Sequence, residues 1–322
     1  LDSISNQTST GSIICAYGFA LDNLGNHTSE TVNEPYAPSM PILPSATIGY
    51  THSPTNRMIN QGSNTTSFNN NGNELVNSGS LNATYTWDEK ENLLTSTSPS
   101  LSCEYDGAEN RRRRNNTRFV LDMLGDNLLM ETDLSGNPVA YYIQGLGLVC
   151  RLDAAQANPA YYHYDYRGST TAITNASQVV THKYLYGAFG EQLAVSETGF
   201  TNNFRYVGKY GVMYEDSSLY FMRARYYNPN KGRFLGEDPV ANKNLYSYGE
   251  NNPIGLIDFN GENASAPESN CTTCGVVNAT ESEPKIKKDG ILCINSFIDG
   301  DIFGGHSWIS FQTIDKKKSL TI

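Results

Sequence analysis

Trp87-Asp88-Glu-Lys-Glu91-Asn92 and Tyr105-Asp106-Gly-Ala-Glu109-Asn110 are two copies of the short unit that decides the fold. In each copy an aromatic or apolar residue precedes Asp or Asn, two variable residues follow, and Gly-Asn or a substitute closes the unit. The Asp carboxylate can accept hydrogen bonds from the backbone amides that follow it, and Gly or Asn tolerates the left-handed conformation that closes a hairpin. The unit therefore predicts a strand, a turn and a second strand. Further copies start at Leu21, Phe68, Leu121, Thr132 and Tyr164.

The units follow one another closely along the chain. The central copies are 19, 18 and 16 residues apart, measured between Asn69, Asp88, Asp106 and Asp122. One hairpin cannot bury its apolar face alone, so serial units are expected to stack side by side into an extended sheet. The alternative is a set of unrelated hairpins in an ordinary β-sandwich.

Composition narrows the function classes of the 322-residue chain. Its formal net charge is −10, and phosphate binding needs concentrated positive charge, so nucleic-acid binding is not expected as the main function. No apolar run approaches the ~20 residues that span a bilayer. Six scattered cysteines, including the lone pair Cys271 and Cys274, indicate neither a disulfide framework nor a zinc site. We expect no cofactor and no metal.

The ends of the sequence also carry expectations. No basic segment followed by an apolar one opens the chain at Leu1, so no signal peptide is visible. The last residues, Ser319–Ile322, have the composition of a strand that is cut in its middle. We therefore expect the sequence to be an internal fragment of a larger protein.

Residues 160–261 are denser in aromatic residues and arginine than the rest of the chain. This stretch holds the runs Tyr161–Ser169, Tyr184–Glu191, Phe204–Tyr210, Leu219–Pro229 and Gly232–Pro239. Together with the preceding units, these motifs resemble the YD-repeat region and Rhs repeat-associated core domain of bacterial polymorphic toxins. The related C components of insecticidal ABC toxin complexes, and more distantly the teneurins, are also similar. The resemblance covers roughly residues 15–261.

The resemblance implies an all-β fold in which YD-repeat hairpins stack into a spiralling β-sheet shell. It divides the chain into a shell segment (1–159), the core domain (160–261), a linker (262–285) and the start of a truncated C-terminal effector domain (286–322). The implied function is a scaffold that encapsulates a C-terminal toxin and releases it after autoproteolysis near the end of the core. The implied partners are the chain's own toxin domain as cargo, secretion or delivery machinery, and an immunity protein. The implied setting is a secreted or cell-surface bacterial protein of interbacterial competition.

Two Asp-containing turns match the family's pair of DPxG motifs, which are associated with self-cleavage. The first turn begins at Asp238 and has Ala241 where the family has Gly. The second begins at Asp258, with Phe259 in place of the usual Pro and Glu262 where Leu is common. These departures leave open whether self-cleavage is retained. The structural alternative is that both motifs are ordinary turns.

Paired carboxylates could carry such a cleavage. When two carboxyl groups are close, one keeps its proton as a general acid while the other activates water. Asp238 and Asp258 are therefore the candidate catalytic pair. A guanidinium would keep the base anionic, and Arg233 is the candidate for this role, with Arg225 in reserve.

Arg111–Arg114 is the one basic run. In a regular strand two of these side chains would face the interior of the shell and two the solvent. Solvated sheet positions are the simple interpretation, and an interior pair that contacts an acidic cargo is the alternative.

The tail contains a second candidate site. Cys293 lies in an apolar run and His306 follows Gly-Gly before Trp-Ile-Ser-Phe, so the two could form a thiolate–imidazolium pair of a hydrolase. A strand histidine beside a core cysteine is the structural alternative. Two other functions thus compete with the toxin scaffold: a hydrolase in the tail, and a cell-surface adhesion or carbohydrate-binding YD-repeat protein.

Overall fold

The computed structural model describes residues 3–21, 27–41, 47–78, 82–122, 127–216, 219–240 and 244–267, together with three short strands after residue 289. The chain divides into two compact units, Asp2–Pro267 and a C-terminal unit of Glu268–Ile322 with Leu1. In the described part of the C-terminal unit the three strands pair antiparallel. They are β24 (Gly290–Ile291), β25 (Ser310–Thr313) and β26 (Ser319–Thr321).

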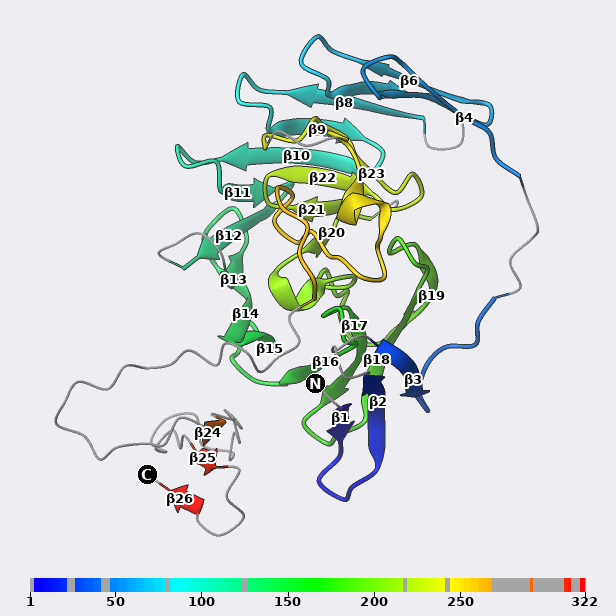
Figure 1. The fold of residues 1–322 in the computed structure, drawn as a ribbon. Helices are drawn as coiled ribbons and strands as arrows, with labels where there is room; N and C mark the ends of the chain where they lie inside the picture. The colour runs from blue at the N-terminus through cyan, green and yellow to red at the C-terminus, as the bar shows by residue number, and fades with distance from the viewer. Residues whose placement is uncertain are drawn as a thin grey trace, which may run out of the picture. The chain divides into compact units, whose positions relative to one another are not determined.

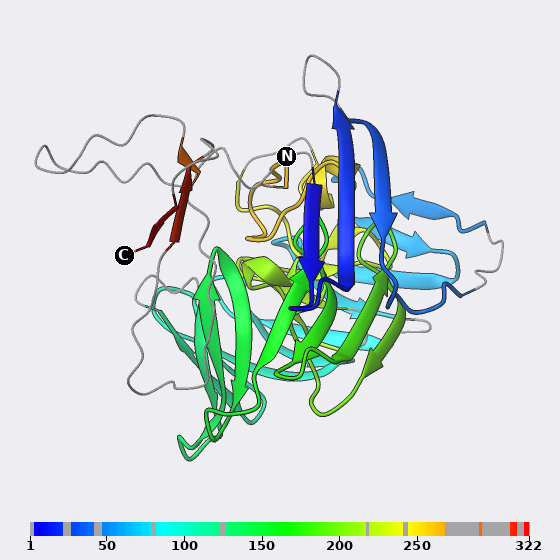
Figure 2. The same ribbon diagram turned by 90° about the horizontal axis from the view of Figure 1, so that it is seen from below.

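The described residues of the unit Asp2–Pro267 form an all-β fold, as the repeats predict, and 16 of the described strands form one sheet in sequence order. In Figure 1 this sheet, from β4 (Tyr50–His52) to β19 (Gln192–Glu197), curves around a smaller sheet, from β20 (Met213–Tyr214) to β23 (Arg233–Phe234). In a third sheet, formed by β1 (Ser3–Gln7), β2 (Ile13–Leu21) and β3 (His27–Asn33), strand β2 contacts β16 and β17 of the large sheet. Figure 2 shows these N-terminal strands in blue beside green strands of the large sheet. Within the described residues, no helix is long and apolar enough for a membrane crossing.

The strands of the three sheets have the following bounds. They are β1 (Ser3–Gln7), β2 (Ile13–Leu21), β3 (His27–Asn33), β4 (Tyr50–His52), β5 (Met58–Gln61), β6 (Asn64–Phe68), β7 (Glu74–Asn77), β8 (Ala83–Trp87), β9 (Leu93–Thr97), β10 (Ser100–Tyr105), β11 (Arg111–Arg114), β12 (Thr117–Leu121), β13 (Leu128–Thr132), β14 (Pro138–Gly145), β15 (Gly147–Asp153), β16 (Ala160–Tyr164), β17 (Thr170–Asn175), β18 (Val180–Tyr186), β19 (Gln192–Glu197), β20 (Met213–Tyr214), β21 (Tyr220–Met222), β22 (Arg225–Asn228) and β23 (Arg233–Phe234). Two short 3-10 turns, η1 (Gly208–Tyr210) and η2 (Tyr248–Asn251), complete the described elements of this unit.

Each described repeat forms the predicted hairpin turn. At the first quoted unit, Asp88 Oδ1 accepts hydrogen bonds from the N–H groups of Lys90 (2.8 Å) and Asn92 (2.9 Å). Glu91 adopts a positive φ of 68° and closes the turn. Asp106 makes the same pair of bonds to Ala108 and Asn110, and the N–H of Asp122 donates to the carbonyl of Asn127. Asp22 lies outside the described residues.

At the start of several hairpin turns, one side chain links neighbouring hairpins. Tyr105 Oη donates to the backbone carbonyl of Leu93 (3.1 Å), and Tyr164 Oη donates to that of Leu148 (2.6 Å). In both cases the acceptor lies at the start of the strand after the preceding hairpin turn, where a β-bulge interrupts the ladder. The same bond is made by Trp87 Nε1 to Glu74 O (2.7 Å), Gln144 Nε2 to Leu128 O (2.9 Å) and Tyr186 Oη to Thr170 O (2.9 Å).

Removing one of these hydroxyls should therefore loosen the stacking of the hairpins. Tyr164→Phe is expected to lower the free energy of unfolding by about 1 kcal/mol, because the carbonyl of the buried Leu148 loses its partner. Tyr161→Phe, on the opposite face of the same strand, is the control and should change it by less than about 0.5 kcal/mol. Urea unfolding of both variants checks this, and equal losses would remove the hydroxyl bond from the explanation.

Two apolar clusters hold the unit together. In the first, the inner face of the large sheet packs residues such as Leu93 and Phe119 against Phe221 and Tyr226 of the small sheet. The second lies inside the core and is largely aromatic, with Tyr206, Tyr220, Tyr227, Phe234 and Tyr248 each at most 1% exposed. Strands β16–β19 continue the large sheet, so residues 160–197 extend it and the chain from about residue 200 packs against its face.

The basic run differs from the regular alternation expected of a strand. A β-bulge places Tyr105 opposite Arg111 and Glu104 opposite Arg113, so Arg112 is an extra residue. Arg111 and Arg114 consequently both point to the core. They form ion pairs with the two carboxylate oxygens of Glu215 at 2.6 and 3.3 Å. The interior pair therefore contacts an acidic residue of this same unit, and Arg111, at 3% exposed, is not a solvated sheet position.

Candidate active site

Three segments of the core bring together one arginine and two aspartates. Arg225 is the first residue of β22, Asp238 follows β23, and Asp258 follows η2. Asp238 is fixed by its own turn, in which its N–H donates to Leu245 O (2.8 Å) and its Oδ1 accepts from the N–H of Val240 (3.0 Å). The two Asp-containing turns that the sequence singles out are therefore neighbours in space.

The guanidinium of Arg225 joins the two carboxylates. Its Nη2 atom lies 3.1 Å from Asp238 Oδ2 and 3.3 Å from Asp258 Oδ2. The three side chains are only 3–5% exposed. Arg225 also donates from Nη1 to Leu245 O (3.1 Å), and its Cζ lies 3.7 Å from the centre of the Phe234 ring. A planar side chain with several fixed donors is needed to hold this set of contacts.

One peptide bond, between Gly261 and Glu262, is held at both of its polar atoms. Arg225 Nε donates to the carbonyl oxygen of Gly261. Asp258 Oδ1 accepts from the N–H of Glu262 (3.1 Å) and from that of Gly261 (2.8 Å). Gly261 has a φ of +74°, and a Cβ there would lie 2.5 Å from the carbonyl oxygen of Met222. Only glycine therefore fits this close approach.

Burial sets the charge state of the cluster. It raises the pKa of Asp258 above its usual range, and the nearby Asp238 adds to the rise, while Arg225 and the two amides oppose it. Burial also lowers the pKa of Arg225, against the pull of the two carboxylates, but a guanidinium stays charged at neutral pH. Asp258 can thus hold a proton at a pH at which an exposed aspartate has lost it.

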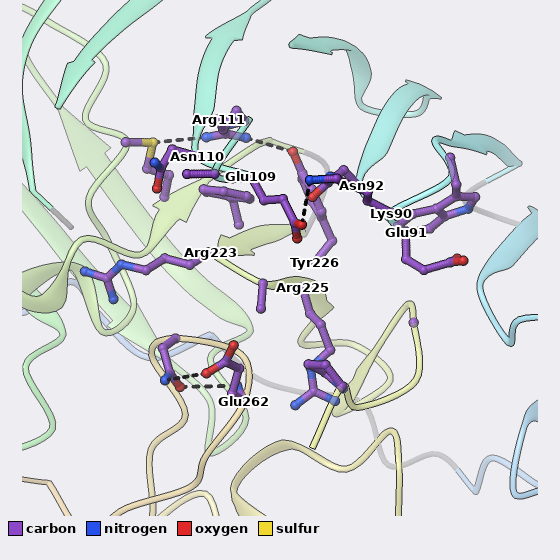
Figure 3. Close-up of a pocket in the computed structure, with 18 of the residues that line it drawn as sticks. Lys90, Glu91, Asn92, Glu109, Asn110, Arg111, Arg223, Arg225, Tyr226 and Glu262 are labelled. Carbon is purple, nitrogen blue, oxygen red and sulfur yellow. Dashed lines mark hydrogen bonds and ion pairs between the residues drawn. The ribbon is translucent and has the colours of Figure 1, made fainter. Parts of the chain in front are cut away.

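A cavity of about 590 Å³ borders this cluster. Arg225, Asp238 and Glu262 line it from the core, while Lys90 and Arg111 line it from the large sheet. Figure 3 shows Arg225 and Glu262 on one side of this cavity and Arg111 on the other. The space is large enough to hold water molecules beside Glu262.

Of the two arginines named from the sequence, the structure brings the reserve candidate into contact with the aspartates. Arg233 instead donates from Nη2 to Asn56 O (2.8 Å) and Asn244 Oδ1 (3.2 Å). The place beside the aspartates that we expected for Arg233 is therefore taken by Arg225. Strand pairing explains this, because Arg233 of β23 pairs with Asn228 at the far end of β22 from Arg225.

The departures from the family motif have different outcomes. Phe259, in the usual Pro position, stacks on Tyr210 with ring centres 5.1 Å apart. The turn that it belongs to is formed nevertheless, through Asp258. Ala241 lies outside the described residues, as do Cys271, Cys274, Cys293 and His306. Among the described residues, no three His, Cys, Asp or Glu side chains group in a way that could hold a metal ion.

Sequence comparison finds similarity to parts of other proteins, two of which are many times longer than this chain. The tRNA nuclease WapA of Bacillus subtilis (strain 168) is 32% identical over 197 residues, which are 55% of this chain and 8% of that protein. The double-stranded DNA deaminase toxin A of Burkholderia cenocepacia (strain H111) is 29% identical over 105 residues, 30% of this chain and 7% of that protein. An uncharacterized protein of Escherichia coli, YibJ, is 28% identical over 158 residues, which cover 44% of this chain and 66% of YibJ. No family model matches the chain.

Structure comparison finds the same fold in a solved toxin-complex component. The crystal structure of TcdB2-TccC3-TEV superimposes with a TM-score of 0.53 at 13% sequence identity. The match covers 80% of this chain and 17% of that one. This chain therefore shares the fold of the matched part of TcdB2-TccC3 and is similar in sequence to a small part of nuclease and toxin proteins many times its length.

Proposed function

We propose that this chain is part of a toxin scaffold whose core cuts the Gly261–Glu262 peptide bond and so separates a C-terminal effector from the scaffold. The observation that supports this is that both polar atoms of that peptide bond are hydrogen-bonded. Arg225 donates to the carbonyl oxygen of Gly261, and the N–H of Glu262 donates to Asp258. The carbonyl oxygen gains negative charge during hydrolysis and the nitrogen must receive a proton. Arg225 therefore already donates to the oxygen that gains charge, and the Asp258 carboxyl group lies within hydrogen-bond distance of the nitrogen to which it would transfer a proton.

The proposed reaction is hydrolysis by a water molecule from the cavity. The water oxygen attacks the carbonyl carbon of Gly261 while Asp238 accepts one of its protons. Arg225 stabilises the resulting oxyanion, and protonated Asp258 gives its proton to the nitrogen of Glu262 as the C–N bond breaks. The products are a carboxyl group on Gly261 and an amino group on Glu262. The raised pKa of Asp258 suits the acid, and no metal or cofactor enters the proposal.

The large sheet is proposed to enclose the segment that follows Glu262 as cargo. The curvature of the sheet around the core supports this (Figure 1), as does the fold shared with TcdB2-TccC3. Two of the proteins that are similar in sequence to this chain have the names of enzymes that act on nucleic acids, a tRNA nuclease and a DNA deaminase toxin. We therefore propose that the effector is a toxic enzyme that is secreted or delivered by dedicated machinery, and that an immunity protein protects the producing bacterium.

The structure bears on one of the two alternative functions, adhesion or carbohydrate binding, and does not describe the residues of the other, the hydrolase in the tail. An adhesion or carbohydrate-binding protein would expose its aromatic residues, yet Tyr206, Tyr220, Tyr227 and Tyr248 are fully buried. The hydrolase built on Cys293 and His306 stays a prediction, because both residues lie outside the described part of the chain.

The cut itself is the first test. Chain made by pulse-labelled cell-free synthesis should convert with first-order kinetics into two fragments, the smaller of which starts at Glu262. Denaturing gels give the rate and intact-mass measurement gives the cut position. A chain that stays whole at mildly acidic and neutral pH, or that is cut elsewhere, would contradict the proposed function.

A further inference from the structure

We propose that the hairpins formed by β4–β7 complete the cutting site by positioning Asp238, so that cutting waits until this part of the sheet has docked on the core. The inference rests on the proposed function and concerns how that same site is regulated. It starts from the segment 230–237, which leads directly to Asp238 and is bonded at several points to residues 56–74 of the sheet. These contacts join residues more than 150 positions apart in the sequence.

The first contact is made by the residue next to Asp238. Glu237 Oε1 accepts hydrogen bonds from Arg57 Nη2 (3.0 Å) and Arg57 Nε (3.3 Å). The other donors of Arg57 bond to the carbonyls of Asn69 (3.2 Å) and Asn70 (3.2 Å) in the β6–β7 turn. One guanidinium therefore fastens the turn of a hairpin to the residue that precedes the proposed base.

The second contact surrounds this ion pair. Tyr246 Oη lies 2.7 Å from the carbonyl oxygen of Gly72, at the same turn, and 3.1 Å from Glu237 Oε1. The Phe68 and Tyr246 rings meet edge to face, with centres 5.9 Å apart. Gly72 has a φ of +88°, and a Cβ there would overlap the Glu237 side chain. The turn and Glu237 are thus fitted closely to each other.

Further bonds anchor the rest of the segment. The N–H of Glu74 donates to Leu235 O (2.9 Å), which extends β7 onto the core. Lys231 Nζ forms a buried ion pair with Glu74, at 2.6 Å, in which the two side chains are 2% and 3% exposed. Arg233, whose Nη2 donates to Asn56 O, belongs to this group of contacts. The position of Arg233 is therefore explained by its contacts with the sheet and not by a role in the proposed cutting reaction.

Arg225 and Asp258 are held in another way. Arg225 lies in β22, which pairs with β21 through Met222, and its guanidinium bonds within the core. Asp258 follows Ile257, which pairs with Ser265 in an isolated β-bridge. Hairpins β4–β7 therefore reach the site through the segment that carries Asp238. Displacing a reacting group by about 1 Å can lower the rate of a reaction by a factor of about 100. Cutting should therefore be slow as long as these hairpins are not docked and Asp238 is not in position.

A charge swap tests the inference in the full chain. Arg57→Glu and Glu237→Arg should each slow the appearance of the Glu262 fragment at least about tenfold, because the segment that leads to Asp238 loses a contact with the sheet. The double variant Arg57→Glu/Glu237→Arg restores opposite charges and should recover the rate to within about threefold. Arg57→Gln, a milder change, should slow cutting as well. The pair suits such exchange because its side chains are 22% and 30% exposed.

Arg113→Glu is the matched control. Arg113 is similarly exposed, at 18%, and forms a 2.9 Å ion pair with Glu104 on β10–β11, away from the segment 230–237. The Arg113→Glu chain should be cut at the wild-type rate. Thermal unfolding of each variant separates positioning from folding, since positioning predicts slow cutting without a matching loss of stability. Wild-type rates in Arg57→Glu, Glu237→Arg and Arg57→Gln, or equal slowing by Arg113→Glu, would overturn the inference. A wild-type chain that never cuts would instead overturn the proposed function.

Discussion

Asp258→Asn and Asp238→Asn are each expected to leave the Gly261–Glu262 bond uncut, with rates at least about 100-fold below that of the wild type. An amide can neither give the proton that the nitrogen of Glu262 needs nor take one from water. No cut product should appear on the time scale of the wild-type reaction, and intact-mass measurement checks this. Equal cutting in the wild type and both variants would remove these residues from the mechanism.

Asp165→Asn provides the matched control for Asp258→Asn. Asp165 also accepts hydrogen bonds from two amides of its turn, Arg167 N (2.9 Å) and Ser169 N (2.8 Å), and its side chain is 9% exposed. It lies in a repeat turn of the large sheet, so this variant should cut at the wild-type rate. Slowing by Asp165→Asn as large as that by Asp258→Asn would show that the loss reflects turn structure and not chemistry.

The raised pKa of Asp258 predicts a pH dependence with a definite sign. Because this pKa is higher in the folded chain than its usual 3.8, the folded chain binds the proton more tightly than the unfolded chain. The stabilising effect of the protonated carboxyl is present at low pH and lost as the pH rises through the raised pKa. Asp258→Asn stays neutral, so it should be at least as stable as the wild type at neutral pH, and this difference should vanish below pH 3.8. Cutting by the wild type should slow above the raised pKa.

The all-β fold could be predicted from the sequence because the repeat is a local device. Asp88 bonds to amides two and four residues ahead, so the information for the turn lies within one unit. The alternation of the flanks, as in Ala83–Trp87 with its alternately buried residues, gives the strand and its inner face. The hydrogen bond from Tyr105 to Leu93 links two hairpins. The only related feature of the sequence is that an aromatic residue recurs before Asp, and this recurrence does not identify the acceptor.

The details of the site could not be predicted, because they depend on register and on distant contacts. The sequence favours Arg233 and leaves Arg225 in reserve, whereas the pairing of β22 with β23 brings Arg225 to the aspartates and Arg233 to the far end of β22. The burial of Arg111 follows from a single bulged residue, Arg112, which no alternation rule anticipates. The contact between Arg57 and Glu237 joins residues 180 positions apart, so nothing local in the sequence indicates it.

The central position of Arg225 explains why two carboxylates can share this buried space. A buried carboxylate without a partner is costly, and the guanidinium stabilises both at once. The same side chain contacts Gly261 O, so it connects the charge state of the aspartates to the polarisation of the bond between Gly261 and Glu262. Lysine has the charge of arginine but not its planar set of donors. Exchanging the two residues therefore separates charge from geometry.

Arg225→Lys is accordingly expected to lower the rate of cutting by about 100-fold or more, the cost of removing a donor to a developing oxyanion. Arg233→Lys should lower it much less, because Arg233 contacts Asn56 and Asn244 rather than the aspartates. Arg167→Lys, at a buried arginine that pairs with Asp165 in the large sheet, should leave it unchanged. The three rates are measured side by side, with thermal unfolding to confirm that each variant folds. If Arg233→Lys were slower than Arg225→Lys, the guanidinium that serves the cut would be that of Arg233, and the static contacts of Arg225 would be structural. If all three cut at the wild-type rate, neither arginine would stabilise the oxyanion, and hydrolysis at Gly261 would have to proceed with the carboxylates alone.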